Sequence, residues 1–465
     1  MEEEDVVIVG AGIAGLATAV ALKRVGIRAL VIEKSGGLRA AGATLSLYPN
    51  GWLALDALGV AHKFINLYAP CRRTYITNVD TGTTQEVSFT RADRSGAVLR
   101  EVHRKTLLEA LAEELPIDTI RFSFKLTSIR TQGQEGSSIA LIDMEDGTTI
   151  RAKALIGCDG VNSVVAARCL GLTAPINSGR WAVRGLARFP QGHGYHDFQQ
   201  FVTDGKRAGF VPLNDKELYW FLTGRVTWTG NMARDPKLIQ KEVIENFAKD
   251  LPQSYTRIVL HSDLSTLTWA PLMYRYPWDI IFGNICKGNI TVAGDAMHPM
   301  TPDLGQNECA ALEDAVVLGQ QIGELIASKA SLGPTEFIFH HRVSVALKRQ
   351  ALMDVNSAAP SSQKTREEIL AWIKLGTAFV ILGIILISLF QALRRCRSNN
   401  GDAPPGPPPA PPEMELQGAN IDVRPLKLEL HCLIILNGGK LFLLCVCVND
   451  FVLVHGFYLS VRRLC

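Results

Sequence analysis

The chain has 465 residues, of which 47% are hydrophobic and 20% are charged. These fractions are typical of globular proteins, so they exclude wholesale disorder and a polytopic transporter. The formal net charge of +3 is too mild to indicate a nucleic-acid partner, and we expect none. The ten cysteines are scattered, which predicts reduced thiols in a cytoplasmic protein rather than a disulfide framework or a metal site.

The N-terminal segment predicts a strand, a turn, a helix and a second strand. Residues 6–9 are β-branched throughout, as in a buried parallel strand, and residues 16–25 continue as an apolar helix. Residues 29–32 form the second strand, which ends at Glu33. The chain begins with acidic residues instead of a basic stretch, so we expect no leader peptide. Three glycines occupy the turn between the first strand and the helix: Gly10, Gly12 and Gly15.

This arrangement is typical of a dinucleotide-binding unit. Gly10 permits the tight turn, Gly12 lets the backbone approach a pyrophosphate, and Gly15 lets the helix pack on the strand. The helix start offers unpaired N–H groups and the positive end of its dipole to phosphates. Glu33 is placed to accept hydrogen bonds from a ribose. A glycine-rich turn without function is the alternative interpretation, and the pattern alone does not separate NAD from FAD.

Two later strand ends each carry a carboxylate and a glycine. Residues 148–156 read as a strand that leads to Asp159 and Gly160, and residues 289–293 lead to Asp295. Ligands of open α/β sheets bind at the C-terminal ends of the strands, so both acids are candidate ligand contacts. Asp295 could bond a ribityl hydroxyl, whereas Asp159 could instead cap a turn or a helix.

Read in order, three motifs resemble one enzyme family. They are GAGIAG at residues 10–15, CDG at residues 158–160 and GDAMHPMTPDLGQ at residues 294–306. Together they resemble the class A (single-component) FAD-dependent monooxygenases. Their residues are most similar to those of the plant branch that resembles zeaxanthin epoxidase and salicylate hydroxylase. The resemblance implies an α/β fold, in which a Rossmann-like FAD-binding domain is interleaved with a mixed β-sheet substrate domain, followed by C-terminal helices.

The implied domain organisation has five segments. Residues 1–165 and 286–360 are expected to form the FAD-binding domain with its closing helices, and residues 166–285 the β-rich substrate domain. Residues 361–395 are expected to contain an apolar helix, and residues 396–465 a Pro-rich linker and a hydrophobic tail. Within the substrate domain, strands are predicted at residues 180–189, 198–203, 207–213 and 218–225. Aromatic residues there could border a pocket, but core packing explains each one as well, so none is assigned to substrate.

The resemblance also implies which residues bind FAD. Arg104 matches an arginine that contacts the cofactor in relatives, although a solvated helix start is the alternative, and Arg39 lies where some relatives place another. Pro299 would lie beside the isoalloxazine ring, and His298 is expected to be structural or a flavin-loop contact rather than a base. No catalytic residue is assigned. The full cofactor set is Gly10, Gly12, Gly15, Glu33, Arg39, Arg104, Asp159, Gly160, Asp295, Pro299, Gly305 and Gln306.

The resemblance implies a reaction as well. NADH or NADPH would reduce the flavin, O2 would add at the flavin C4a carbon, and the hydroperoxide would pass one oxygen to the substrate. That substrate would be a small aromatic or isoprenoid-like molecule, hydroxylated or epoxidised, with the other oxygen leaving as water. Two alternatives stay open. One is a flavin dehydrogenase or oxidase on the same fold, and the other is a weakly flavin-binding pseudoenzyme that acts as an interaction protein.

One departure from the family pattern affects the cofactor. Relatives usually carry two small residues after the Gly-Gln of the third motif, whereas this chain has Asn307 and Glu308. Asn307 tolerates left-handed backbone angles, but Glu308 places negative charge at a helix start that would face an anionic reduced flavin. We therefore hypothesise that this chain binds FAD more weakly, or is reduced less readily, than its relatives.

The last quarter of the chain does not match the family. Residues 372–390 are apolar and long enough, as a helix, to span a bilayer, but a buried or interfacial helix explains them equally well. Membrane association through this segment is therefore one of two expectations. Residues 402–412 are Pro-rich and predict an extended linker. Residues 441–459 are again apolar, which predicts either a second membrane segment or translation of an altered reading frame.

Overall fold

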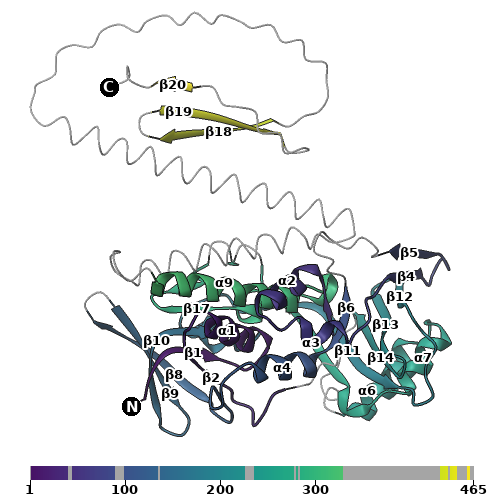
Figure 1. Ribbon diagram of the computed structural model, residues 1–465. Helices are drawn as coiled ribbons and strands as arrows, with labels where there is room; N and C mark the ends of the chain where they lie inside the picture. The colour runs from purple at the N-terminus through teal and green to yellow at the C-terminus, as the bar shows by residue number, and fades with distance from the viewer. Residues whose placement is uncertain are drawn as a thin grey trace, which may run out of the picture. The chain divides into compact units, whose positions relative to one another are not determined.

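The computed structural model describes most of the first 327 residues and three short segments near the C-terminus. The described residues are 2–39, 44–88, 99–134, 137–225, 235–276, 279–280, 283–327, 430–437, 440–447 and 458–460. The chain divides into two compact units, Met1–Pro360 and Ser361–Cys465. The first unit contains all the residues assigned to a cofactor, and Figure 1 shows its two sheets with their helices.

The first sheet of this unit has eight strands and is mainly parallel at its centre. β1 (Glu2–Val9) lies between β10 (Thr149–Gly157) and β2 (Ala29–Ile32), and it pairs in parallel with both. Two predicted strands are confirmed: β1, which ends before the glycine turn, and β2, which follows the helix after that turn. The other strands are β7 (Ile120–Arg121), β8 (Leu126–Gln134), β9 (Ser137–Met144), β16 (Cys286–Lys287) and β17 (Ile290–Val292).

Two long helices pack against each other over this sheet. α1 (Ile13–Arg24) begins at the glycine turn, and α9 (Asn307–Ala327) follows the third motif (Figure 1). Their contact is close because Gly319 has no side chain: a Cβ there would meet the Cβ of Ala21 at 2.7 Å. With the sheet on one side and α9 on the other, α1 is buried from Ile13 to Leu22. The α/β architecture predicted for the cofactor domain is confirmed.

The second sheet has seven strands and supplies the mixed β-sheet that the sequence predicts. Its central strands are antiparallel, and β12 pairs in parallel with β4. β4 and β5 precede residue 100, a segment that the sequence analysis did not assign to this sheet. In spatial order the strands are β15 (Thr268–Tyr274), β11 (Ile176–Arg188), β14 (Glu217–Gly224), β13 (Lys206–Asn214), β12 (Phe198–Thr203), β4 (Arg73–Asn78) and β5 (Thr84–Ser88).

A separate aromatic core holds the second sheet to its helices. α6 (Pro236–Glu242) and α7 (Gln253–Leu260) pack beside it (Figure 1). Trp220, Tyr255 and Phe210 are almost fully buried in this core. These rings therefore pack the interior, as the sequence analysis expected for most aromatics of this region.

A separate two-stranded sheet lies at the junction of the two larger sheets. β3 (Thr44–Leu47) pairs antiparallel with β6 (Arg100–His103), so that Ser46 faces Glu101. α2 (Pro49–Ala57) follows β3, and α4 (Arg104–Glu113) follows β6. β6 also contacts β13 of the second sheet, so the β3–β6 pair brings residues of both regions together.

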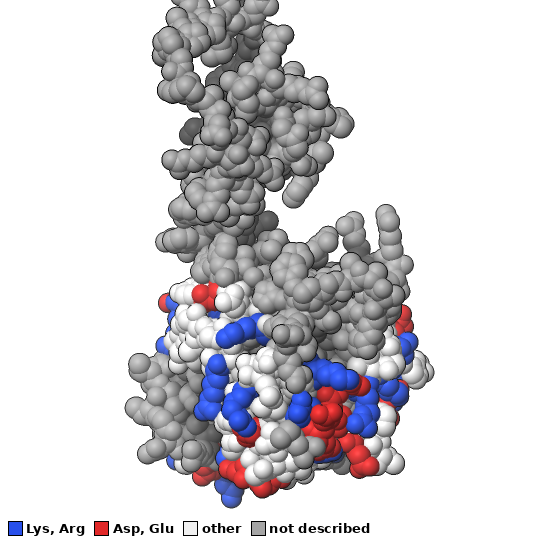
Figure 2. Space-filling model, turned by 90° about the vertical axis from the view of Figure 1, so that its left-hand side faces the viewer, with Lys and Arg blue, Asp and Glu red and all other residues white. Residues whose placement is uncertain are grey.

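Charges of both signs are mixed on the face that carries the N-terminus and the β8–β9 pair (Figure 2). The ion pairs of these elements include Lys125–Glu145 at 2.7 Å and Arg130–Asp143 at 2.9 Å. Such exposed pairs contribute little to stability. The mixture fits the small net charge of the chain.

The second unit contains one small sheet among its described residues. β18 (Leu430–Asn437), β19 (Lys440–Cys447) and β20 (Tyr458–Ser460) pair antiparallel in that order. The strands cover part of the apolar segment 441–459, whose origin stays a hypothesis. Segments 372–390 and 402–412 lie outside the described residues. Among the residues that are described, no helix combines the length and apolarity needed to cross a membrane.

Candidate active site

The glycine turn has the geometry that a pyrophosphate site requires. Gly10 adopts a φ of 104°, and its N–H donates to the carbonyl of Ile32 at 2.8 Å. A Cβ on Gly15 would lie 1.9 Å from the Gly10 carbonyl oxygen, so only glycine fits there. Gly12, at the N-terminus of α1, has open space around it, with nothing within 4 Å of a built Cβ. The open side of this turn can therefore admit a phosphate group against the helix dipole.

Glu33 lies beside this turn as an ionised acceptor. Its carboxylate accepts hydrogen bonds from the backbone N–H groups of Ala11 and Ser35, both at 2.9 Å. Burial alone would raise the pKa of Glu33, but these two N–H groups outweigh it and hold the pKa below its usual value. Arg39 is exposed in the loop that follows β2, and its charge also favours ionised Glu33.

Asp159 serves as a helix cap in this structure. One carboxylate oxygen accepts from the N–H of Val164 at 2.6 Å, and the other accepts from the Ser163 hydroxyl. Both contacts stabilise the start of α5 (Val164–Arg168). The next residue, Gly160, has a φ of 81°, which explains the glycine. The capping alternative thus describes what Asp159 does here, and a contact with FAD stays a prediction.

The three motifs converge, although they are far apart in the sequence. A Cβ on Gly10 would lie 2.5 Å from the carbonyl oxygen of Cys158, directly before Asp159. A Cβ on Gly294 would lie 2.8 Å from the Cβ of Ala14, in the first turn of α1. The first motif therefore touches both of the others. This convergence is the arrangement that one elongated ligand needs.

A cavity of about 350 Å³ lies between the third motif and the second sheet. Arg104, Asp295, Pro299 and Gly305 line it, so the structure brings four of the residues assigned to FAD together. The glycines of the first motif, Glu33, Arg39, Asp159 and Gly160 lie outside this lining. The second sheet and the β3–β6 pair supply the opposite walls: Thr44, Ser46, Glu101, Arg184, Phe198, Gln200, Arg207, Val211, Tyr219, Phe221 and Thr223.

Buried polar contacts beneath the cavity hold the third motif in place. The Asp314 carboxylate accepts from the Gly294 N–H and hydrogen-bonds His298 Nε2, each at 2.7 Å. Asp314 is fully buried and His298 is 4% exposed, so His298 has a structural role here. Arg275 donates to the carbonyl of Ala296 at 2.9 Å from the other side. The sequence analysis did not assign Asp314 to the site. The signal available for it was its position in α9, seven residues after the start of the helix that follows the third motif.

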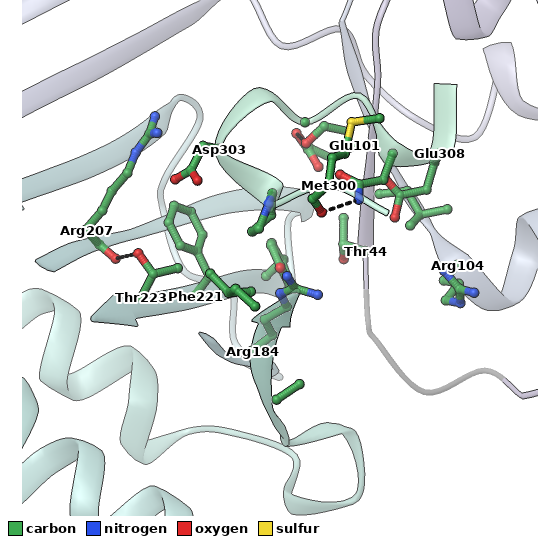
Figure 3. A pocket seen from close by; sticks show the side chains of 18 of the residues that line it. Thr44, Glu101, Arg104, Arg184, Arg207, Phe221, Thr223, Met300, Asp303 and Glu308 are labelled. Atoms are coloured by element: carbon green, nitrogen blue, oxygen red, sulfur yellow. Dashed lines mark hydrogen bonds between the residues drawn. The ribbon is translucent and has the colours of Figure 1, made fainter. Parts of the chain in front are cut away.

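Gln306 links the third motif to α2. Asn50 donates through its amide nitrogen to Gln306 Oε1 at 3.0 Å and to Glu313 Oε2 at 2.9 Å. Gly305, directly before it, has a φ of 62° and lies against the ring of Tyr48. Both residues therefore fix the turn that enters α9. Asn307 continues it by donating to the carbonyl of Met300 at 2.8 Å (Figure 3).

Acidic groups and arginines share the cavity (Figure 3). Burial raises the pKa of Asp295, and nearby His298 and Arg104 partly offset that rise. Burial also raises the pKa of Glu308, which is opposed by Arg104 and reinforced by Asp295. The Asp295 carboxyl thus disfavours ionisation of Glu308, while Arg104 favours the ionised form of both acids. Glu308, the residue that departs from the family pattern, faces the cavity as the hypothesis requires.

Arginines on the second sheet border the cavity from the other side. Arg184 of β11 lines the cavity, and Arg207 of β13 donates through Nε to Gln200 Oε1 at 2.9 Å. Arg180 forms an ion pair with Asp303 of the third motif at 2.7 Å. This pair ties the second sheet to the loop above it. The sequence analysis assigned no residue of this sheet, because alternating apolar residues indicate a strand but not which side chain meets a ligand.

Comparison with known proteins identifies the group to which these features belong. The FAD binding domain family matches residues 3–334. "Monooxygenase 2" of Arabidopsis thaliana is 43% identical over 341 residues, covering 72% of this chain and 82% of that protein. A FAD-dependent urate hydroxylase of Klebsiella pneumoniae is 28% identical, covering 67% of this chain and 80% of its own length.

Solved structures show the same fold. The structure of Klebsiella pneumoniae HpxO complexed with FAD and uric acid superposes with a TM-score of 0.62 at 23% identity, and it covers 80% of this chain and 92% of that one. The chain therefore belongs to the FAD binding domain family, as one of its FAD-dependent monooxygenases.

Proposed function

We propose that this protein uses NADH or NADPH and O2 to hydroxylate or epoxidise a small aromatic or isoprenoid-like molecule. The observation that carries the proposal is the cavity between the third motif and the second sheet. One side of it presents Asp295, Pro299 and Gly305, and the other presents Tyr219 and Phe221. A polar loop that suits a flavin thus faces an aromatic wall that suits a substrate.

The described residues fit FAD. The open turn at Gly12 and the start of α1 would hold the pyrophosphate, and Glu33 would accept from the ribose. Asp295 would bond the ribityl chain, with Pro299 and Gly305 beside the ring. When bound, the flavin supplies the electron transfer and the reaction with O2.

The chain's own contribution is to position the substrate and to exclude water. Tyr219 and Phe221 stand two residues apart on β14, so both point to the cavity side of the sheet. Burial raises the pKa of Tyr219 to about 12, so its hydroxyl stays protonated and would be able to donate a hydrogen bond to a substrate. The Arg180–Asp303 pair keeps the loop against the sheet, which limits the entry of water.

Spectroscopy and isotope labelling test this proposal. The full chain is purified with added FAD, its visible spectrum is recorded, and phenolic compounds are screened for stimulated NAD(P)H oxidation. Oxygen from labelled O2 must then appear in the product, because a dehydrogenase or an oxidase on this fold would leave the product unlabelled. Gly12→Ala is expected to fold normally, since nothing lies within 4 Å of a Cβ built there. It is expected to bind FAD more weakly, because the added methyl group would occupy the space proposed for the pyrophosphate. A wild-type protein that takes up no FAD would contradict the proposal and favour the pseudoenzyme.

A further inference from the structure

Glu101 is a buried acid that neither the motifs nor the fold explains. It lies in β6 opposite Ser46 and is 4% exposed. The Ser46 hydroxyl donates to Glu101 Oε1 at 2.7 Å. Glu101 Oε2 is buried and has no hydrogen-bond partner within the part of the chain that the structure describes. An unpartnered carboxyl oxygen in a protein interior is costly, so it calls for a ligand or another explanation.

The free oxygen belongs to a residue that borders two hollows. Glu101 lines the main cavity (Figure 3), and it also lines a smaller adjoining pocket of about 110 Å³. Phe198 of β12 and Val211 of β13 line both hollows as well. Glu101 therefore lies where the β3–β6 pair meets the second sheet, and it is also near enough to Glu308 for that charge to act on its pKa. The proposed function gives the second-sheet side of the cavity to the substrate and the side of Asp295 and Gly305 to the flavin.

None of the described side chains around Glu101 donates to its free oxygen. Phe198 and Val211 are apolar beside it, and its serine partner is already engaged at the other oxygen. Tyr48 and Tyr219 share the cavity lining with Glu101, but neither donates to Oε2. Burial raises the pKa of Glu101 to about 7, with the negative charge of Glu308 adding to the rise and the Ser46 hydroxyl opposing it. Burial therefore favours the neutral form of this carboxyl. It can accept a hydrogen bond without the full cost of a buried charge.

We propose that Glu101 is the substrate-orienting residue of this cavity, whose free carboxyl oxygen accepts a hydrogen bond from a hydroxyl or ring N–H of an aromatic substrate. The apolar walls hold the ring, and the bond to Glu101 fixes which edge of it faces the flavin. This inference rests on the proposed function, because it needs the flavin on the side of Asp295. It assigns to Glu101 a role in recognition and none in the redox chemistry.

Paired probes test the inference in the FAD-loaded full-length protein. Phenol is compared with anisole and indole with N-methylindole, because each second member lacks the donor hydrogen, and binding is followed by the change in flavin absorbance. The wild type is expected to bind the donor of at least one pair about 10-fold more tightly or better. Glu101→Leu is expected to abolish that preference. Glu101→Gln keeps an acceptor oxygen and is expected to retain part of it.

The control and the contrary outcomes separate this inference from the proposed function. Glu109→Gln removes an exposed acid of α4 paired with Lys105, and it is expected to behave as wild type. Equal affinities within both pairs for the wild type, or no binding of any probe, would overturn the inference, as would a preference that survives in Glu101→Leu. A Glu101→Leu protein that binds FAD more weakly but keeps the preference would show that the flavin is the donor, and would overturn it too. If the wild type takes up no FAD, the proposed function itself fails.

Discussion

The two large sheets of the first unit are specified by different kinds of contact. Around β1 and α1, backbone atoms approach one another so closely that single glycines decide the geometry, as at Gly15. In the second sheet, large side chains such as Trp220 and Tyr255 fill the interior. Backbone contacts cannot adjust, whereas packed side chains can shift by small amounts. Short sequence motifs therefore predict the first region, whereas only a pattern of apolar residues predicts the second.

The buried pair beneath the third motif is expected to show the largest effect. His298→Ala leaves the fully buried Asp314 carboxylate without its side-chain partner, which is expected to lower the free energy of unfolding by about 3 kcal/mol or more. Chemical denaturation measures it. If His298→Ala instead has the same free energy of unfolding as the wild type and loses only turnover, the prediction that His298 is structural is wrong, and a role as a base is favoured.

A pair of glycine substitutions tests the comparison directly. Gly15→Ala places a Cβ 1.9 Å from a backbone oxygen, so we expect a loss of about 3 kcal/mol in the free energy of unfolding. Gly185→Ala in β11 meets only side-chain atoms of Leu267 and Trp220, at 3.0 and 3.1 Å, and is expected to cost about 1 kcal/mol. Similar losses in thermal unfolding of the two variants would show that the two regions do not differ in this way.

The buried carboxyl at the junction of the two regions predicts a pH dependence. Burial raises the pKa of Glu101 from 4.5 to about 7, so the folded state holds the proton more tightly and loses stability as the pH rises through this interval. Glu101→Gln removes the penalty, which the shift sets at about 3 kcal/mol. The variant is expected to unfold at a higher temperature than wild type at pH 8, and most of the gain disappears at pH 5. A gain that is equal at both pH values would contradict the raised pKa.

The departure at the start of α9 is expected to have the smallest effect. Asn307→Gly with Glu308→Gly removes a partly buried acid near Arg104 and Asp295, so we expect FAD to bind about 10-fold more tightly, which corresponds to about 1.4 kcal/mol. Fluorescence quenching measures the affinity, and equilibration with a redox dye measures the flavin potential, which should rise. Glu308→Gln is the control that removes charge without removing bulk. If the FAD affinity, the flavin potential and the rate of NAD(P)H oxidation are all unchanged, the hypothesis that Glu308 weakens FAD binding or reduction is wrong.

Part of the fold around the candidate cofactor site could be predicted from the sequence. The β-branched runs predicted strands that end shortly before Gly10 and Asp295, and the structure has β1 and β17 there. The roles of Gly10, Gly15 and Asp295 in FAD binding stay predictions. Asp159 shows the limit of this reasoning. A carboxylate after a strand suits a ligand or a helix cap equally, and the structure shows it bonded to the start of α5.

The sequence by itself determined the parallel strand order around the glycine turn, because the β-branched runs and the glycines act through contacts between near neighbours in the chain. Only the tertiary structure decided that β4 and β5 join the second sheet, that Asp314 supports Gly294, and that Glu101 faces a cavity. These contacts link residues that no short motif connects. Whether an acid is exposed or buried beside an aromatic wall depends on which distant strands pack against it, and local patterns do not encode that.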